Sequence, residues 1–171
     1  MDNTVLKNDI ARYSDKGRIP WFQKLFRKVQ SSVGIINIFY RCLYKIVARS
    51  SHIEIPPKCM IGAGLYIGHA FCITINEKAV LGKNCNIHKG VTIGRENRGS
   101  RKGTPTIGNC VWIGINSTIV GNIVIGDDVL IAPNIYINRD VPSHSIVFGN
   151  PCIIKPCDNA TAEYINQKIE I

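Results

Sequence analysis

The sequence predicts an all-β solenoid, because aliphatic residues return every six positions through most of the chain. One unbroken series comprises Ile107, Ile113, Ile119, Ile125, Ile131 and Ile137. Two earlier series comprise Ile75, Leu81, Ile87 and Ile93, and Ile55, Ile61 and Ile67. This period fits neither one amphipathic helix nor one alternating strand, and it is typical of a repeated short strand and corner. The positions between are rich in Gly, Asn and Asp, which tolerate the positive φ of a tight corner.

Three six-residue units would form one triangular coil of about 18 residues, which rises by about 4.8 Å, the spacing of paired strands. Stacking these coils predicts two inward ladders: Ile61, Leu81, Ile107 and Ile125, and Ile67, Ile87, Ile113 and Ile131. The small inward positions between them include Cys59 and Cys85. A single coil would not be stable alone, so we expect one continuous domain over residues 51–157.

Residues 1–50 are expected to form a helical extension before the solenoid. Within it, residues 20–50 predict a helix, because apolar residues recur at three- and four-residue spacings. These residues are Phe22, Leu25, Phe26, Val29, Val33, Ile36, Tyr40, Leu43 and Val47. We expect this helix to pack on the end of the solenoid or on a neighbouring subunit; the alternative is a basic amphipathic surface that contacts an anionic membrane. Residues 158–171 are expected to form a C-terminal tail or a short helix, with 160–168 as the helical candidate.

Composition limits the possible classes of protein. With 171 residues, 45% hydrophobic and 19% charged, the chain is predicted to fold rather than remain disordered. The seven cysteines include no CxxC pair, which favours a reducing compartment. Lys7, Asp9 and Arg12 argue against a secretory signal peptide. We therefore expect a cytoplasmic protein, with a peripheral position at the inner face of the membrane as a variant.

The net charge of +9 is scattered over the chain without a nucleic-acid-binding module. Coenzyme A phosphates, an anionic sugar or a membrane would explain this charge more economically. We therefore expect no nucleic-acid partner.

Two interruptions of the six-residue rhythm are the candidate functional segments, since irregularities in a repeat commonly mark function. Ile67 and Ile75 are eight residues apart, so two residues bulge out, and His69 lies on this bulge. The second interruption, residues 95–106, adds roughly eight residues to the repeat. This excursion carries Arg95, Arg98, Arg101 and Lys102.

Several motifs together resemble the serine acetyltransferase-like branch of the hexapeptide acyltransferases over about residues 50–155. They are Glu54-Ile55-Pro56-Pro57, the run 61–69 ending in Gly68-His69, Gly90-Val91-Thr92-Ile93-Gly94, the run 109–114, the run 140–144 and Gly149-Asn150-Pro151. The resemblance implies a left-handed parallel β-helix, acetyl-CoA as the donor, and a homotrimer with active sites between neighbouring chains. Within the branch, the sequence is most similar to capsule and exopolysaccharide O-acetyltransferases of the colanic-acid type.

The resemblance implies that His69 is the general base and that Glu54, fifteen residues earlier, is its carboxylate partner. A neutral imidazole can accept a hydroxyl proton at physiological pH. A carboxylate on the other ring nitrogen would fix the tautomer and stabilise the imidazolium that forms. The hydroxyl would then attack the thioester directly, with a backbone N–H holding the oxyanion. The alternative is that His69 is an ordinary exposed histidine.

The same resemblance places the donor along the coils. Small residues at Gly94, Gly114 and Ala132 would let the pantetheine arm lie close to the backbone, and Lys155 could reach a coenzyme A phosphate. For Trp112, subunit packing is favoured over stacking on adenine.

The acceptor is expected to be a sugar hydroxyl of a cell-surface polysaccharide or its precursor. Serine acetyltransferases carry Asp where this chain has Gly68, and an Arg-His pair that helps bind serine where it has Gly103-Thr104. His88, Arg95 and Arg98 are the candidate acceptor-binding residues, although a solvated loop would also explain the arginines. Serine O-acetylation is the alternative.

Two further classes were considered. A γ-type carbonic anhydrase has the same fold but needs two His separated by four residues, and His52, His69, His88 and His144 include no such pair. We therefore expect no metal. The other class is a non-catalytic solenoid scaffold.

Overall fold

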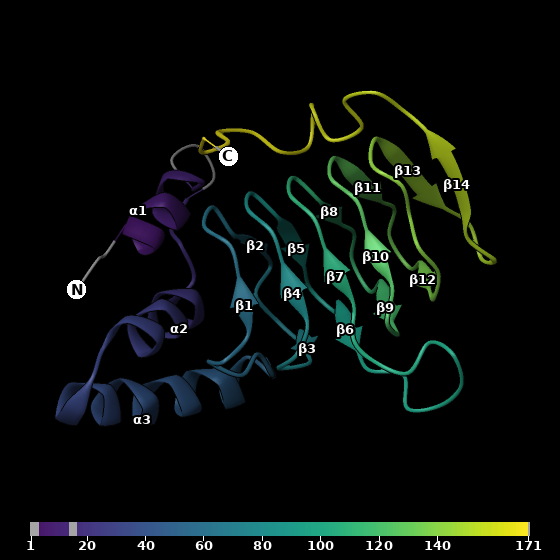
Figure 1. The fold of residues 1–171 in the computed structure, drawn as a ribbon. Coiled ribbons are helices and arrows are strands. Elements are labelled where there is room, and N and C mark those ends of the chain that lie inside the picture. The colour runs from purple at the N-terminus through teal and green to yellow at the C-terminus, as the bar shows by residue number, and fades with distance from the viewer. Residues whose placement is uncertain (1–3, 14–16, 171) are drawn as a thin grey trace.

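The computed structural model describes residues 4–13 and 17–170, and it shows a three-sided parallel β-helix with helices at its N-terminal end (Figure 1). The helices are α1 (Thr4–Ala11), α2 (Trp21–Ser31) and α3 (Gly34–Ser50). The strands are β1 (Met60–Ile61), β2 (Tyr66–Gly68), β3 (Thr74–Ile75), β4 (Val80–Leu81), β5 (Asn86–His88), β6 (Thr92–Gly94), β7 (Thr106–Ile107), β8 (Trp112–Ile113), β9 (Thr118–Val120), β10 (Val124–Ile125), β11 (Val129–Ile131), β12 (Tyr136–Ile137), β13 (Ser145–Phe148) and β14 (Ile153–Pro156).

The strands form three sheets, which the chain visits in turn in each coil. Sheet I has the order β1-β4-β7-β10, sheet II the order β2-β5-β8-β11-β13-β14, and sheet III the order β3-β6-β9-β12. The pairing is parallel except for β14, which folds back antiparallel on β13. The predicted β-solenoid with N-terminal helices is therefore confirmed.

Strand register confirms both predicted ladders. In sheet I, Ile61 pairs with Leu81, and Ile107 lies between Leu81 and Ile125. The sheet II ladder is Ile67, Ile87, Ile113 and Ile131, and sheet III adds a third, Ile75, Ile93, Ile119 and Ile137. All of these side chains are buried. Each buried isoleucine contributes roughly 1.5–3 kcal/mol, so the ladders dominate the stability of the solenoid.

The corners also follow the prediction. Asn84, Asn116, Asp128 and Asn134 have φ between 53° and 62°. Short polar side chains tolerate this left-handed conformation better than other non-glycine residues. The chain can therefore turn between sheets without a glycine at every corner.

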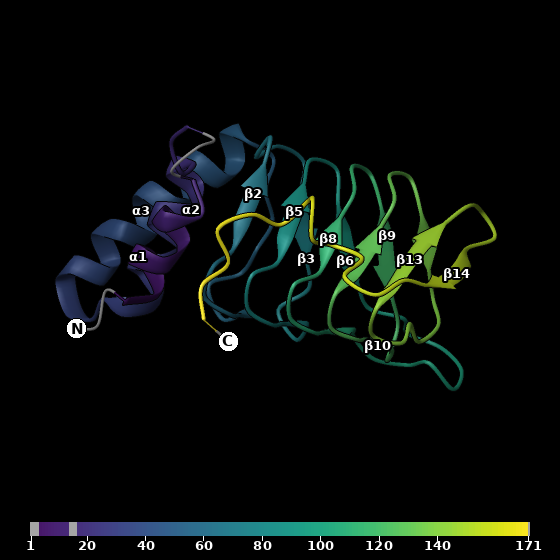
Figure 2. The ribbon, with the colours of Figure 1, turned by 90° about the horizontal axis from the view of Figure 1, so that it is seen from above.

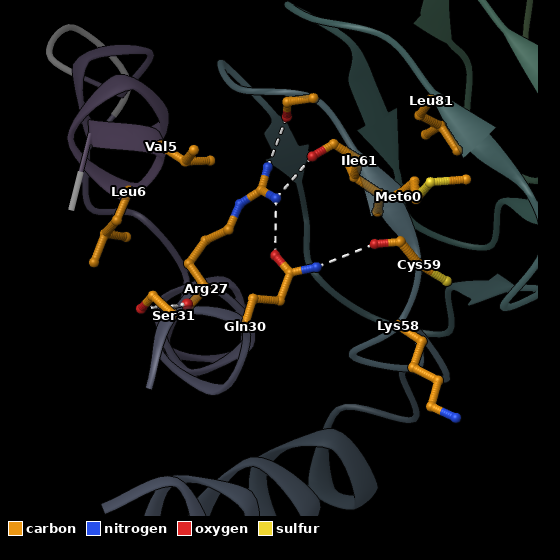
Figure 3. Close-up of a pocket in the computed structure, with 11 residues that line it drawn as sticks. Val5, Leu6, Arg27, Gln30, Ser31, Lys58, Cys59, Met60, Ile61 and Leu81 are labelled. Carbon is orange, nitrogen blue, oxygen red and sulfur yellow. Dashed lines mark hydrogen bonds between the residues drawn. The ribbon is translucent and has the colours of Figure 1, made fainter. Parts of the chain in front are cut away.

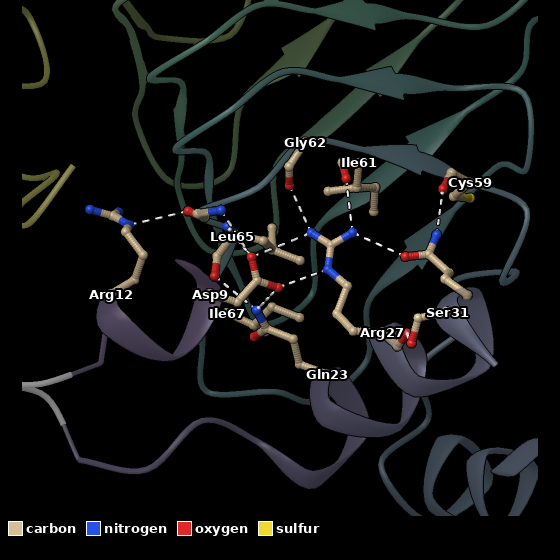
Figure 4. A network of polar contacts seen from close by, with 12 residues as sticks. Asp9, Arg12, Gln23, Arg27, Ser31, Cys59, Ile61, Gly62, Leu65 and Ile67 are labelled. Carbon is tan, nitrogen blue, oxygen red and sulfur yellow. Dashed lines mark hydrogen bonds and ion pairs between the residues drawn. The ribbon is translucent and has the colours of Figure 1, made fainter. Parts of the chain in front are cut away.

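Helix α1 lies within the predicted helical extension, although no separate helix was specified there, and with α2 it closes the exposed edge of the first coil (Figure 4). The buried Asp9 carboxylate accepts hydrogen bonds from the backbone N–H groups of Gly64 and Leu65, at 2.9 and 3.0 Å. It also pairs with buried Arg27 at 2.8 Å from Nε. Arg27 in turn donates to the Ile61 carbonyl, at 2.8 Å. The side chains of Asp9 and Arg27 thus form hydrogen bonds with backbone groups at the edge of the first coil, where the described part of the chain has no preceding strand to form them.

The single helix predicted over 20–50 is instead a pair, α2 and α3, interrupted by two residues before Gly34, whose φ is +64°. The apolar face of α2 is buried as expected. Val33 and Ile36, however, are 69% and 58% exposed, so they do not pack on the solenoid of their own chain. The break changes the direction of the chain, and α3 packs inward through Tyr44. No helix in the described ranges is long and apolar enough to span a bilayer.

Of the tail and the short helix expected at this end, the structure shows the tail. Residues 158–164 form turns, residues 165–170 are bends and irregular backbone, and the segment runs back along the outside of sheet II towards the N-terminal helices (Figure 2). We call this segment the C-terminal strap. Gln167, inside residues 160–168, has a φ of 53°, which is incompatible with a helix that continues through this position. Thr161 and Ile165 are buried against the coils.

One end of the strap is held by Asp128. Its carboxylate accepts hydrogen bonds from the backbone N–H groups of Ala160 and Thr161, both at 3.0 Å, and from the Thr161 hydroxyl at 2.7 Å. His144 Nδ1 lies 2.9 Å away. Burial alone would raise the pKa of Asp128, but the hydrogen bonds from Thr161, His144 and Ala160 outweigh it and lower this pKa.

The other end of the strap is held near the first coils. The Asn84 side chain donates to the Ile169 carbonyl and accepts from the Ile169 N–H, at 2.9 and 3.0 Å. Arg12 donates to the Asn166 carbonyl and to the Asn86 side chain. The strap therefore joins the N-terminal helices to the end of the chain.

Candidate functional site

The candidate site begins at the bulge after β2. Five residues separate Ile67 from Ile73, against three between Ile87 and Val91. Strand pairing of Ile67 with Ile87 and of Ile75 with Ile93 confirms the predicted two-residue bulge. His69 is exposed, and its φ is +55°, the left-handed conformation of a corner. The bulge thus presents an imidazole to solvent where the other coils turn directly.

His88 lies next to this bulge, because β2 and β5 pair Gly68 with His88. The His88 Nδ1 atom is 2.8 Å from the Ile113 carbonyl oxygen. A carbonyl only accepts, so Nδ1 must carry the hydrogen. The ring covers Gly68 so closely that a Cβ added there would lie 2.6 Å from Cδ2 and 2.9 Å from Nε2. The structure therefore brings His69 and His88 to the same corner.

An aromatic row that the sequence analysis missed supports His88. The centroids of the His88 and Trp112 rings are 4.6 Å apart, and those of Trp112 and Tyr164 are 5.1 Å apart. Tyr66 lies on the other side of His88 at 6.4 Å. Trp112 therefore packs within its own chain, against the strap. The coil register pairs Tyr66 with Asn86 and Asn86 with Trp112. Counting residues could therefore have placed Tyr66 and Trp112 in one column, two residues before the position of His88.

Glu54 extends sheet III by one position. Its N–H donates to the Ile73 carbonyl at 2.7 Å and its carbonyl accepts from Ile75 at 2.8 Å, so it pairs with Thr74. Both Glu54 and His69 are exposed, and within the described ranges no hydrogen bond joins their side chains. Catalytic contacts of this kind are often long before substrate binds.

A cavity of about 560 Å³ adjoins Glu54 and the end of α3. Its lining includes Lys45, Arg49 and His52 beside the Glu54 carboxylate. These bases were not predicted as site residues. The four-residue spacing of Lys45 and Arg49 on α3 could have grouped those two, whereas His52 lies beyond the end of the helix.

The excursion forms a loop between β6 and β7 that projects from the solenoid (Figure 1). Reciprocal backbone hydrogen bonds of 3.0 Å between Glu96 and Gly103 close its base. Arg95 and Arg98 are exposed on it. The loop follows sheet III, whereas His69 precedes that sheet, so the two flank it on opposite edges.

The four candidate donor residues also divide into two groups. Gly114 and Ala132 directly follow β8 and β11, in the column that begins with Gly68 and His88. Gly114 is required there, since an added Cβ would lie 2.6 Å from the Pro133 nitrogen. Gly114 itself is buried between the coils, whereas Ala132 is partly exposed.

Gly94 and Lys155 lie elsewhere. Gly94 ends β6 and pairs with Val120 at the far edge of sheet III. Lys155 is exposed on β14. A site that used all four donor residues would therefore need more than one face of the solenoid.

A second cavity, of about 540 Å³, lies between α1, α2 and sheet I (Figure 3). Arg27 and Gln30 line it, but both already bond to the protein, Arg27 to the Ile61 carbonyl and Gln30 to the Cys59 carbonyl at 3.1 Å. Its polar groups thus serve the edge of the first coil. We do not include it in the candidate site.

Comparison with known proteins was consistent with this architecture. The family described as bacterial transferase hexapeptide (six repeats) matches residues 104–139. A serine acetyltransferase from Synechococcus elongatus is 39% identical over 99 residues, which cover 58% of this chain and 41% of that protein. The chain therefore spans less than half the length of this relative.

Two solved structures extend the similarity over most of the chain. Serine acetyltransferase from Brucella abortus in complex with coenzyme A has a TM-score of 0.75 and 26% identity, covering 90% of this chain and 67% of that one. Serine acetyltransferase from Neisseria gonorrhoeae in complex with serine has a TM-score of 0.72 and 28% identity, covering 90% and 68%. The chain is thus a hexapeptide-repeat β-helix similar to serine acetyltransferases.

Proposed function

We propose that this chain is an acetyl-CoA-dependent O-acetyltransferase that transfers acetyl directly to a hydroxyl group, with His69 as the general base. The observation that carries the proposal is the bulge, which departs from the repeat and exposes a histidine. His88 and the small residues Gly114 and Ala132 continue from it along the coils. The similarity to serine acetyltransferases, one of them bound to coenzyme A, supports the donor.

In the proposed reaction, His69 accepts the proton of the acceptor hydroxyl while the oxygen attacks the thioester carbon. The tetrahedral intermediate collapses with loss of the coenzyme A thiolate, which takes up the proton that His69 had accepted. Glu54 would orient the imidazole and stabilise its protonated form. A backbone N–H near the small residues would hold the oxyanion.

The active unit is proposed to be a homotrimer. His69 and the excursion flank opposite edges of sheet III in one chain, and Gly94 is separated from Gly114 in the same way. A neighbouring solenoid could supply the excursion with Arg95 and Arg98. Light scattering should report a trimer, and an active monomer would contradict this assembly.

Serine is the acceptor that the relatives support best, because the solved enzyme from Neisseria gonorrhoeae binds it. A sugar hydroxyl is the second candidate, and residues of this chain favour it. The His88 ring fills the space that a side chain at Gly68 would need. The Arg-His pair implied for serine binding is replaced by Gly103-Thr104.

The test is an acetyl-transfer assay with acetyl-CoA over serine, nucleotide sugars and oligosaccharides, with release of free coenzyme A as the common readout. Transfer to serine alone would exclude the sugar proposal. Transfer to a sugar would exclude serine as the main acceptor. No thioester cleavage with any hydroxyl acceptor would favour the non-catalytic scaffold.

A further inference from the structure

The outward face of α3 is apolar and uncovered. Ile35, Ile38, Phe39 and Ile46 are 84%, 62%, 60% and 65% exposed. Their spacing places them on one side of the helix. Tyr44, on the opposite side, is buried. A helix that is apolar on both faces is ordinarily buried on both faces. We therefore expect another molecule to cover the outward face of α3.

Positive charge borders this face. Residues 17–53 contain seven Lys and Arg and neither Asp nor Glu. On α3, Arg41, Lys45 and Arg49 are exposed. Four-residue spacing aligns them in a row along one flank of the apolar side chains. An exposed apolar stripe beside an unbroken basic row is the pattern of a helix that lies in a lipid–water interface.

We propose that this α3 outer face, formed by the four apolar and three basic side chains above, docks on an anionic membrane surface. The apolar side chains would enter below the headgroups while the bases contact lipid phosphates. A second copy of the same face fits less well, because it would bring two basic rows together, and α3 itself carries neither Asp nor Glu. The proposal is independent of the reaction that the chain catalyses.

The test is flotation of the full chain with vesicles of phosphatidylglycerol and phosphatidylcholine, compared with phosphatidylcholine alone. We expect binding to the anionic vesicles and release at about 0.5 M salt, since screening shortens the reach of the charges. Phe39→Ser with Ile46→Ser should lower partitioning at least about tenfold. Each of Arg41→Gln and Lys45→Gln should lower it roughly fivefold.

The matched control is Val124→Ser, which removes a 56% exposed aliphatic side chain from sheet I and should leave vesicle binding unchanged. Circular dichroism checks that each variant is folded. Absence of binding by the unsubstituted chain, or equal binding to neutral vesicles, would overturn the proposal. The proposal would also be overturned if the Phe39→Ser, Ile46→Ser variant bound vesicles as well as the unsubstituted chain but had a smaller mass in light scattering without lipid. That result would identify the α3 outer face as a subunit interface.

Discussion

Substituting Gly68 by alanine tests the contact between the bulge and His88. The new Cβ would lie 2.6 Å from His88 Cδ2, whereas carbon atoms prefer about 3.5–4.0 Å, so the ring must retreat by about 1 Å. This movement strains the 2.8 Å hydrogen bond to Ile113, whose net worth is about 0.5–1.5 kcal/mol. Overpacking generally costs about 1–3 kcal/mol. The entropic gain of Gly→Ala at a compatible position offsets about 0.4–1 kcal/mol. We expect a net loss of about 1–2 kcal/mol.

The assay is urea unfolding of a double-mutant cycle with His88→Ala. Without the imidazole, Gly68→Ala should be neutral or stabilise the chain by about 0.4–1 kcal/mol. The coupling between the two substitutions should therefore reach roughly 2 kcal/mol, well above the additivity limit for independent sites. Equal effects of Gly68→Ala in both backgrounds would refute the contact.

Three further predictions concern the base, the strap and the core. His69→Ala should reduce turnover by roughly 10²–10⁴-fold with little change in acetyl-CoA affinity, and Glu54→Gln should reduce turnover less. Steady-state kinetics measure turnover, and coenzyme A titration measures the affinity. A folded His69→Ala protein with normal transfer would exclude His69 as the base. Because folding lowers the pKa of Asp128 below its ordinary value of 3.8, its contribution to stability should be complete above that pH and be lost as the pH falls through the folded value. Asp128→Asn should weaken this acid dependence in unfolding curves measured between pH 6 and 2, and an unchanged profile would contradict the assignment. Ile113→Asp places a carboxylate at a fully buried position and should prevent cooperative folding by circular dichroism, whereas a stable variant would show that the ladder tolerates charge.

The sequence predicted the solenoid well because its core is local and periodic. Each ladder isoleucine recurs at a fixed interval, so counting residues was enough to pair Ile67 with Ile87 and to find the bulge at His69. The excursion was found in the same way, as an insertion in the count. The handedness did not follow from the residues and came from the resemblance.

Features that depend on contacts across the chain were not predictable. Asp9 and Arg27 bond to backbone groups more than thirty residues away, and nothing in the periodicity of α1 indicates such partners. The course of the strap was not predicted, because its polar bonds to Asp128 and Asn84 carry no local signature in the sequence. At the site, counting residues from coil to coil could have predicted that Gly68 pairs with His88. The position of residues that a neighbouring subunit would contribute could not be predicted from the repeat of one chain.

The strap has a consequence for how the protein folds. Solenoids ordinarily lose structure coil by coil, because each repeat touches only its neighbours. Here the hydrogen bond from Arg12 to Asn166 spans 154 residues, and the strap is also anchored in the intervening coils at Asn84 and Asp128. Fraying at either end must therefore release the strap as well, which should couple the coils into one cooperative unit. During synthesis, the N-terminal helices would remain incompletely fixed until residues 158–170 leave the ribosome, and such long sequence separation favours slow folding.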